Sequence, residues 1–520
     1  MPGPETWTTT RPALRAGDGM VAAQHVDAAR AGAAILHAGG NAVDAAVAAA
    51  LSLGVVEPWM CGLGGSGLMV AWLAGEGRAV GLDFQGVLAG NASTDAYPVD
   101  PDLPRTLMGF PAVRGQANVI GPGSITVPGA PRGLQHALDR WGSRDRGTVA
   151  APAVALADRG HAANWFTTLQ VALAMDGLAR DATSAALWLP GGNPVQPGTV
   201  VANPALASTL RLWAEGGADA LAGPIAGDLA AIGSDIVRSD LDAYRAVERT
   251  VDAVPHRDAV VHAPGPESGG ARLRRFLRDA ATVRPGDLGP GTWAAYARGL
   301  TTAWAEHDVR MGRDVGAGTC TSHLSVVDRW GNMATLTHTL LNRFGSGVTL
   351  PGTGLLTNDA VGYFDPRPGR PTSVAGGKRI DASNMCPTIV TRNGAAVLAV
   401  GASGGNHIVP AVAQVVALTL DHGLPLDAAL DHPRLDLSGG PALRMDPRLG
   451  PDVAARLARD GAVVADQRTV FPKLYACPTA VAVEDGACVG ACDPSLPVAG
   501  AAAPGPFVVE AVTQRAGVQA

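Results

Sequence analysis

The sequence predicts one interleaved α/β unit, and three of its features support this fold class. Hydrophobic residues make up 47% of the 520 residues and charged residues 17%, which is typical of a folded globular protein. Residues 130–320 have mainly helical spacing, whereas alternation with a period of two is prominent after residue 320. Neither an internal repeat nor a long linker divides the chain, so we expect helices and strands to share one core.

The N-terminal region is predicted to begin with a short strand and to continue mainly in helices. The strand lies around residues 20–23. Asn41 can cap a helix over residues 42–53, because its side chain can accept hydrogen bonds from the first free backbone amides. Asn203 can cap a second helix over residues 204–213 in the same way, and a proline at the first helical position suits this start.

Two β-hairpins are predicted in the last two-fifths of the chain. Residues 322–328 and 333–340 alternate with a period of two on either side of a turn. Residues 388–392 and 395–400 flank Asn-Gly, the strongest two-residue hairpin signal. A glycine-rich turn then leads into a helix predicted over residues 409–421.

Charge and hydropathy exclude several classes of function. The net charge of −6 argues against a nucleic-acid partner, and no run of 18 apolar residues could cross a membrane. The N-terminus has no apolar stretch typical of a signal peptide, so we expect a cytoplasmic protein. Six cysteines are few for this length and predict reduced thiols. Because no metal-ligand spacing is present, we expect neither a metal nor another cofactor.

Residues 62–67 (GLGGSG) fit the dinucleotide-binding pattern G-x-G-x-x-G letter for letter. That pattern needs a strand before it and a helix after it. Here a predicted helix precedes the glycines, and the apolar residues 68–72 that follow them favour a strand. We therefore do not expect a dinucleotide site.

The most informative stretch is residues 319–328 (TCTSHLSVVD), which places hydroxyl and thiol groups at the start of a strand. A nucleophile at the first residue of a strand suggests a protein that cuts its own chain. The new N-terminal residue then carries its own base, the freed α-amine. The candidate nucleophiles are Thr319, Cys320, Thr321 and Ser322.

Thr339 is predicted to lie opposite Thr321. A hairpin centred between Trp330 and Gly331 pairs Thr321 with about residue 340, and a one-residue bulge would bring Thr339 to this level. A second hydroxyl there could fix the rotamer of the nucleophile. The alternative interpretation is that threonine-rich segments are simply good strands.

Gly404 and Gly405 are candidates for an oxyanion site. They end a predicted strand and open a helix, and glycines let backbone N–H groups approach a ligand closely. The helix N-terminus also favours negative charge. The alternative is an ordinary strand-to-helix turn.

These segments together resemble the gamma-glutamyltransferase (gamma-glutamyltranspeptidase) family of N-terminal-nucleophile hydrolases. The resemblance extends over nearly the whole chain, and its motifs follow the family's order. The matching segments are residues 39–48, 62–67, 127–129, 243–248, 344–347, 351–354, 385–388 and 403–405.

The resemblance implies an αββα sandwich and autocatalytic cleavage between Cys320 and Thr321. Cleavage would give a large subunit, residues 1–320, and a small subunit, residues 321–520. The two subunits of one precursor would stay associated and could pair further into a heterotetramer.

The resemblance also implies roles for individual residues. Thr321 would be the nucleophile and its α-amine the base, with Thr339 as hydrogen-bond partner. The N–H groups of Gly404 and Gly405 would stabilise the oxyanion. The match of residues 323–328 to the family favours Thr321 over the other candidate nucleophiles.

The positions expected to bind a gamma-glutamyl group differ from the family pattern. The arginine that holds the α-carboxylate is replaced by Gln85. The acidic residue and the asparagine that meet the α-ammonium are replaced by Tyr363 and Leu341. Replacing a bidentate cation by glutamine removes a contact worth ~1.5–3 kcal/mol. We therefore expect poor binding of glutathione-like substrates.

Other polar residues near these positions could bind substrate. Asn342 is adjacent to Leu341, and the family's Ser-Ser pair reads Ser383-Asn384. The missing charges could also come from four nearby residues: Asp359, Lys378, Arg379 and Asp381.

The hypothesis that follows is an autoprocessed threonine hydrolase with altered choice of a small-molecule substrate. Members of the family are expected to include enzymes that cleave oxamate-type amides and glutaryl side chains. Others are expected to break a C–C bond beside a carbonyl in the formation of 4-alkyl-L-proline units of lincosamide and pyrrolobenzodiazepine antibiotics. The alternatives are a true gamma-glutamyl hydrolase or transpeptidase, and a processed but inactive binding protein.

Overall fold

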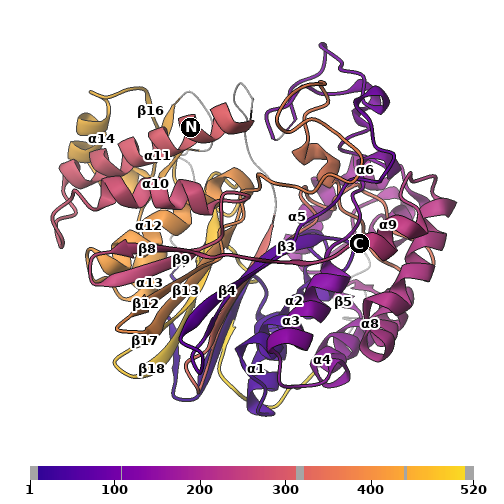
Figure 1. Ribbon diagram of the computed structural model, residues 1–520, viewed down its shortest axis with the longest axis horizontal. Coiled ribbons are helices and arrows are strands. Elements are labelled where there is room, and N and C mark those ends of the chain that lie inside the picture. Colours follow the sequence, from indigo (N-terminus) through magenta and orange to yellow (C-terminus); the bar gives the residue numbers. More distant parts are fainter. Residues whose placement is uncertain (1–9, 107, 312–320, 438–441, 510–520) are drawn as a thin grey trace, which may run out of the picture.

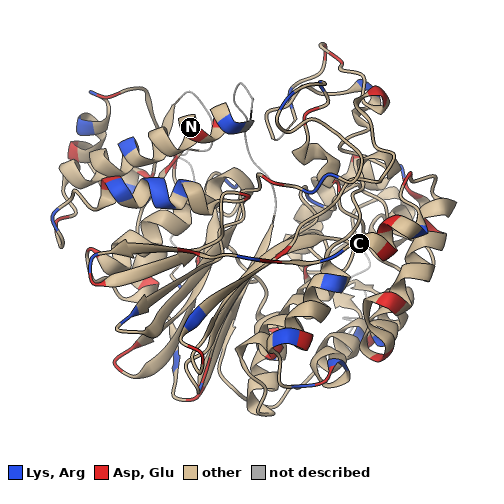
Figure 2. Ribbon diagram, viewed as in Figure 1, with Lys and Arg blue, Asp and Glu red and all other residues tan. Residues whose placement is uncertain are grey.

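A computed structural model describes residues 10–106, 108–311, 321–437 and 442–509. Two seven-stranded antiparallel sheets lie face to face, and helices cover the outer face of each (Figure 1). The predicted αββα sandwich is therefore confirmed. Figure 2 shows charged residues mainly on the outer helices and connecting loops. Two of the candidate nucleophiles, Thr319 and Cys320, lie outside the described residues.

The first sheet, sheet A, contains strands from both parts of the chain. In spatial order they are β1 (Leu14–Ala16), β18 (Ala487–Cys492), β17 (Cys477–Glu484), β13 (Ala395–Ser403), β12 (Thr388–Arg392), β9 (Ala259–Ala263) and β8 (Asp252–His256). Strands on both sides of residue 321 are therefore hydrogen-bonded neighbours, as at β12 and β9.

The second sheet, sheet B, is interleaved in the same way. Its order is β19 (Gly500–Ala502), β2 (Gly19–Ala23), β10 (Ser322–Asp328), β11 (Met333–Thr339), β3 (Ser66–Leu73), β4 (Arg78–Phe84) and β7 (Val247–Arg249). Strand β10 pairs with β2 on one side and with β11 on the other, so the segment after residue 321 lies in the middle of the sheet.

Helices form the two outer layers. Sheet B is covered by α1 (Val26–His37), α2 (Ala42–Val56), α3 (Ala130–Trp141), α4 (Arg146–Arg159) and α8 (Pro204–Ala231). Sheet A is covered by α10 (Gly270–Ala280), α11 (Pro290–Met311), α12 (Ile408–Leu420), α13 (Leu426–Asp431) and α14 (Pro451–Leu457). Among the described residues, no helix is long and apolar enough to cross a membrane.

Short elements complete the fold at its periphery. The helices are α5 (Trp165–Ala172), α6 (Met175–Leu178), α7 (Ala182–Trp188) and α9 (Arg238–Ala243). The strands are β5 (His161–Ala162), β6 (Val200–Val201), β14 (Leu435–Asp436), β15 (Leu443–Met445) and β16 (Val463–Ala465).

Several predicted elements have the expected starting points because their signals are local. Asn41 accepts hydrogen bonds from the amides of Val43 and Asp44, which completes a capping box at the start of α2. Asn203 caps α8 by accepting from the amide of Leu206. Both helices run further than predicted, to Val56 and Ala231. The chain segment GLGGSG lies between a helix and a strand, as expected for a segment that is not a dinucleotide site.

The prediction that residues 130–320 are mainly helical missed five strands, the two-residue strands β5 and β6 and three strands of the main sheets. Strands β7, β8 and β9 occupy sheet edges or near-edge positions between residues 247 and 263. They are three to five residues long, and β8 contains Pro255, which a strand at the edge of a sheet tolerates. Strands this short carry little of the period-two alternation that marks a strand in sequence.

The one extra residue predicted for the first hairpin is present, but not within its paired strands. Strand register is continuous from Ser322 opposite His338 to Val327 opposite Met333. The extra residue lies instead in the turn, where Gly331 has φ +81°. A three-residue loop with glycine in the left-handed conformation is a standard hairpin connection. This loop brings Thr321 level with Thr339.

Candidate active site

One face of the central hairpin is lined with hydroxyl groups. Because side chains alternate along a strand, odd-numbered residues of β10 and β11 share the face toward sheet A, and even-numbered ones face α1 and α2. The imidazole of His323 confirms this direction, because a Cβ on Gly401 of β13 would lie 2.2 Å from it. The polar residues of this face are Thr321, His323, Ser325, Thr335, Thr337 and Thr339.

Thr321 and Thr339 lie at the active-site end of this face. The Thr321 hydroxyl donates to the Thr339 hydroxyl at 3.4 Å, and the backbone amide of Leu341 donates to the same Thr339 oxygen at 2.8 Å. Both threonines are buried, at 2% and 1% exposure. The amide of Leu341 thus orients Thr339, and Thr339 contacts the candidate nucleophile.

His323 is a structural member of this face. Its Nδ1 lies 3.0 Å from the Thr337 hydroxyl, and its Nε2 lies 3.1 Å from the hydroxyls of Ser325 and Thr335. Burial lowers the pKa of His323 to about 3, so the ring is neutral at physiological pH. The neutral imidazole and its hydroxyl partners satisfy one another between the two sheets.

A buried carboxylic acid lies directly behind the start of β10. Glu57 ends α2, and its Oε2 is 2.5 Å from the hydroxyl of Ser322. Burial raises the pKa of Glu57 to about 8, although the hydrogen bond from Ser322 and the charge of Lys473 partly oppose this shift. Glu57 therefore holds a proton at neutral pH. The same burial raises the pKa of the adjacent Cys61 thiol, which stays protonated.

Gly404 and Gly405 form the turn between β13 and α12. Gly404 has φ +135° and Gly405 has φ +57°, conformations that favour glycine. A Cβ on Gly404 would lie 2.8 Å from the Cα of Ala476, so only glycine fits there. The ammonium of Lys473 donates to the hydroxyl of Ser403 at 2.8 Å, which brings a positive charge to this turn.

The Ser383–Asn384 segment is tied to the same turn. The side-chain amide of Asn384 donates to the Asn406 side chain at 2.5 Å. Arg272 of α10 donates to the Asn384 side-chain oxygen at 2.8 Å and to the Ser383 carbonyl at 3.1 Å. The Arg272 guanidinium also lies over the ring of Trp304, 4.9 Å from its centroid. A buried cation therefore positions the segment that faces the glycine turn.

The three positions that differ from the family pattern carry uncharged side chains. Gln85 is fully buried and donates to the Ile380 carbonyl at 3.3 Å. Leu341 and Tyr363 belong to one buried apolar cluster. The other members are Leu88, Tyr97, Met108, Phe110, Val113, Ala360, Val361, Phe364, Val374, Ile380 and Ala382. Two of the three positions, Leu341 and Tyr363, thus lie in apolar packing where the family pattern has polar groups.

Two of the charged residues considered as replacements do lie near these positions. Asp359 accepts hydrogen bonds from the backbone amide of Asn342, at 2.9 Å, and from its side chain. Burial raises the pKa of Asp359 to about 7. Arg379 donates to the backbone carbonyl of Gln85 at 3.0 Å and lies 3.5 Å from the carboxylate of Asp83. Both groups already have protein partners.

The other two candidate charges, Lys378 and Asp381, are also near these positions. The Lys378 ammonium lies 6.0 Å from the centroid of the Phe364 ring, and Asp381 follows Ile380, whose carbonyl accepts from Gln85. The ammonium of Lys378 donates to the carbonyls of Pro371 and Ser373, at 2.7 and 3.2 Å. Asp381 is exposed. Among the described residues, neither forms an ion pair.

Sequence patterns missed Glu57, Lys473 and Arg272. The only local signal for Glu57 is a charged residue at the end of an otherwise apolar helix. Arg272 lies among the charges of an amphipathic helix, and Lys473 lies in a loop. Their places in the site depend on contacts between segments that are far apart in sequence.

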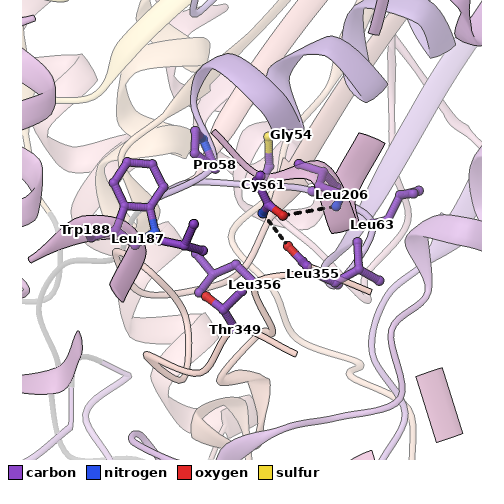
Figure 3. A pocket seen from close by; sticks show the side chains of 14 residues that line it. Gly54, Pro58, Cys61, Leu63, Leu187, Trp188, Leu206, Thr349, Leu355 and Leu356 are labelled. Atoms are coloured by element: carbon purple, nitrogen blue, oxygen red, sulfur yellow. Dashed lines mark hydrogen bonds between the residues drawn. The ribbon is translucent and has the colours of Figure 1, made fainter. Parts of the chain in front are cut away.

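A small cavity beside Cys61 is not part of this site (Figure 3). Its volume is about 30 Å³, and its walls are largely apolar, with Leu63, Trp188 and Leu355 among them. None of the candidate catalytic or substrate-binding residues lines it. A cavity of this size and polarity is a packing gap rather than a substrate pocket.

Comparison with known proteins finds relatives along most of the chain. The chain matches the family described as Gamma-glutamyltranspeptidase over residues 28–294 and 297–503. The protein belongs to the gamma-glutamyltranspeptidase family. It is therefore an enzyme of the N-terminal-nucleophile hydrolase type.

Relatives of this gamma-glutamyltranspeptidase-family chain include both acylases and glutathione hydrolases. The Acylase ACY 1 proenzyme of Pseudomonas sp. (strain SE83) is 33% identical over 496 residues, covering 86% of this chain and 88% of its own. The Glutathione hydrolase proenzyme of Pseudomonas sp. (strain A14) is 30% identical over 473 residues, with 80% of each chain covered. The crystal structure of cephalosporin acylase from Bacillus halodurans shares the fold, with a TM-score of 0.82 and 24% identity over 97% of this chain and 99% of that chain.

Proposed function

We propose that the protein is an N-terminal-threonine acylase that hydrolyses the amide of an acyl group without the glutamyl zwitterion. The observation that carries this proposal is the neutral character of three positions. Gln85 is uncharged, and Leu341 and Tyr363 lie within a buried apolar cluster. The similarity to an acylase proenzyme supports the same choice of substrate class.

Thr321 acts first on its own chain in this proposal. Its hydroxyl attacks the carbonyl of Cys320, the peptide C–N bond breaks, and the nitrogen of Thr321 gains a proton to become the α-amine. Water then hydrolyses the ester that joins residue 320 to the Thr321 oxygen. Residues 1–320 and 321–520 become the two subunits, consistent with the proenzyme names of the relatives.

The mature enzyme then cleaves substrate through a covalent intermediate. The α-amine of Thr321 takes the proton of the Thr321 hydroxyl, which attacks the substrate carbonyl, and the N–H groups of Gly404 and Gly405 hold the oxyanion. The amine leaving group departs with a proton, and water hydrolyses the acyl-enzyme. Thr339 orients the attacking oxygen through the contact at 3.4 Å.

The charge state of Glu57 suits this use of the α-amine. A carboxylate beside the amine would favour the ammonium form and raise the amine pKa. The proton held by Glu57, the hydrogen-bond partner of Ser322, removes that negative charge, and the positive charge of Lys473, which acts on Glu57, would also oppose protonation of a nearby amine. Both effects favour the neutral amine that can serve as a base.

The first experiment tests self-cleavage. We expect purified protein to run as two bands and Thr321→Ala as one, with mass spectrometry placing threonine at the N-terminus of the small chain. Ser322→Ala is the matched control, because it removes the neighbouring hydroxyl and should still be cut. A wild-type enzyme that is active as one uncut chain would refute the mechanism.

The second experiment tests the acyl group. Mature enzyme is assayed with p-nitroanilides that differ only in the acyl part: gamma-glutamyl, glutaryl and neutral acyl. We expect the gamma-glutamyl compound to be the poorest substrate. Efficient turnover of gamma-glutamyl-p-nitroanilide or of glutathione would instead support a true gamma-glutamyl hydrolase or transpeptidase.

Hydrolytic C–C cleavage is a second candidate reaction for the same nucleophile. The apolar cluster around Leu341 and Tyr363 favours it, because a conjugated substrate that can stabilise a leaving carbanion is itself largely apolar. Such an enzyme would fit a cytoplasmic route to 4-alkyl-L-proline units. Release of a carboxylic acid without an amine product, detected by mass spectrometry, would distinguish C–C cleavage from amide hydrolysis.

A further inference from the structure

A cleft of about 640 Å³ is lined by Asn342, which is three residues after Thr339 in the chain. This volume lies within the range of pockets that bind small molecules. Its walls are the loop between residues 104 and 120, the segment from α5 to α6, and the turn of residues 342–347. Figure 1 shows the loop after β4 and helix α6 together at one end of the molecule. Neither Gln85 nor Tyr363 lines the cleft, whereas Asn342, next to the family's asparagine position, does.

Unsatisfied amide groups face this cleft. Asn118 lines it and is 2% exposed, yet neither its side-chain nitrogen nor its side-chain oxygen has a hydrogen-bond partner. The side-chain oxygen of Asn342 is also buried without a partner. An unmade hydrogen bond of a buried polar atom costs about 1–3 kcal/mol, so a polar partner in the cleft, either a ligand or an ordered water, would stabilise these groups.

The charged residues of the cleft are mostly arginines. Three arginines line it, Arg105, Arg180 and Arg343, against one carboxylate, Asp176. The Nε of Arg343 donates to the Gln170 side chain at 2.6 Å, which holds the guanidinium in place. Neither Arg343 nor Arg180 forms an ion pair with a carboxylate of the described residues.

The alternative interpretation is that the arginines simply form a solvated surface, and this accounts for an exposed residue such as Arg180. It does not account for Asn118, whose side-chain amide is buried in the wall of the same cleft. An oxyanion bound between the arginines would accept from their N–H groups and from the Asn118 nitrogen. Planar guanidinium groups bind carboxylate and phosphate through two parallel hydrogen bonds.

We propose that this cleft binds an oxyanion, a carboxylate or a phosphate, carried by the molecule whose carbonyl reacts at Thr321. The inference rests on the proposed acylase function and deepens it. Continuity along the chain connects the two places: Leu341 donates its amide to Thr339, and Asn342, the next residue, lines the cleft. The apolar cluster and the arginine cleft would then receive different parts of one substrate.

The test compares two probes on mature enzyme. Binding of glutarate and of inorganic phosphate is measured by calorimetry, and each is tested as an inhibitor of neutral acyl-p-nitroanilide hydrolysis. We expect at least one probe to bind at millimolar concentration and to compete with substrate. The tighter probe identifies the oxyanion as carboxylate or phosphate. Failure of both probes to bind the wild-type enzyme would overturn the proposal.

Variants locate the binding. Arg343→Met is expected to weaken the bound probe at least about tenfold, since it removes a charge-assisted pair of hydrogen bonds. Arg180→Met provides a second test that does not depend on the packing around Arg343, because Arg180 is exposed. The matched control is Arg140→Met on the exposed surface of α3, which should leave probe affinity unchanged. Unchanged affinity in both cleft variants would contradict the assignment.

Different results would refute the proposed anion site and the proposed acylase function. Loss of the anion site leaves covalent labelling of Thr321 by a neutral electrophilic acyl analogue intact. Absence of that labelling in wild-type enzyme would instead refute the proposed function, whatever the cleft binds.

Discussion

Replacing Glu57 by glutamine should change how the stability of the protein depends on pH. The carboxyl group is fully buried, and its pKa rises from the usual 4.5 to about 8 on folding. Below pH 4.5 the group is protonated in both the folded and the unfolded states, so it adds no pH dependence. Between these two values only the unfolded state releases the proton, and the free energy of unfolding falls as pH rises.

The size of this effect follows from the shift itself. One pH unit corresponds to 1.36 kcal/mol, so the wild-type protein should lose about 4 kcal/mol between pH 5 and pH 8 through Glu57 alone. Glutamine at this position does not titrate and can still hydrogen-bond to Ser322. The difference between wild type and Glu57→Gln should therefore shift by about 4 kcal/mol in favour of the variant over that interval.

Equilibrium unfolding in urea at several pH values measures this difference. The Thr321→Ala background keeps the chain uncut for reversible refolding, and Glu215→Gln on the exposed surface of α8 serves as the control. Contributions of other titrating groups cancel in the comparison. Parallel stability curves for Glu57→Gln and its parent would show that Glu57 does not retain its proton on folding.

Two further substitutions test the packing and the capping that position the site. Gly401→Ala should destabilise the fold by about 1–3 kcal/mol, because the new methyl would lie 2.2 Å from the His323 ring, and Gly75→Ala in an open turn should not. A lower urea midpoint only for the first variant is expected, and equal midpoints would contradict the packing between the sheets. Asn41→Ala should cost about 1–2 kcal/mol, because α2 loses its capping side chain. Thermal unfolding that is unchanged by this substitution would show that the cap adds nothing to stability.

Sequence reasoning succeeded where the structural signal is local. The Asn393-Gly394 pair takes φ values of +51° and +78°, as a tight hairpin turn requires, and it joins β12 to β13 where predicted. The period-two pattern placed the hydroxyls of Thr335, Thr337 and Thr339 on one face, and the structure has them there. These features depend only on residues that are close together in the chain.

The parts that sequence could not supply depend on distant segments. Glu57 reaches Ser322 across 265 positions of sequence, and Arg272 reaches Asn384 across 112. No periodicity marks such pairs, because each partner alone looks like an ordinary polar residue. The elevated pKa of Glu57 likewise arises from burial by the whole fold, not from its neighbours in sequence.

The alternation of strands from before and after residue 321 has a consequence for the lifetime of the assembled enzyme. Cleavage at that point would create a new N-terminus, but the two polypeptides would stay associated. Release of either one requires breaking backbone hydrogen bonds in both sheets. Dilution should not dissociate the two subunits, and subunits should not exchange between enzyme molecules when two preparations are mixed. Either half synthesised alone would expose bare strand edges and tend to aggregate, so the two must fold together as one precursor.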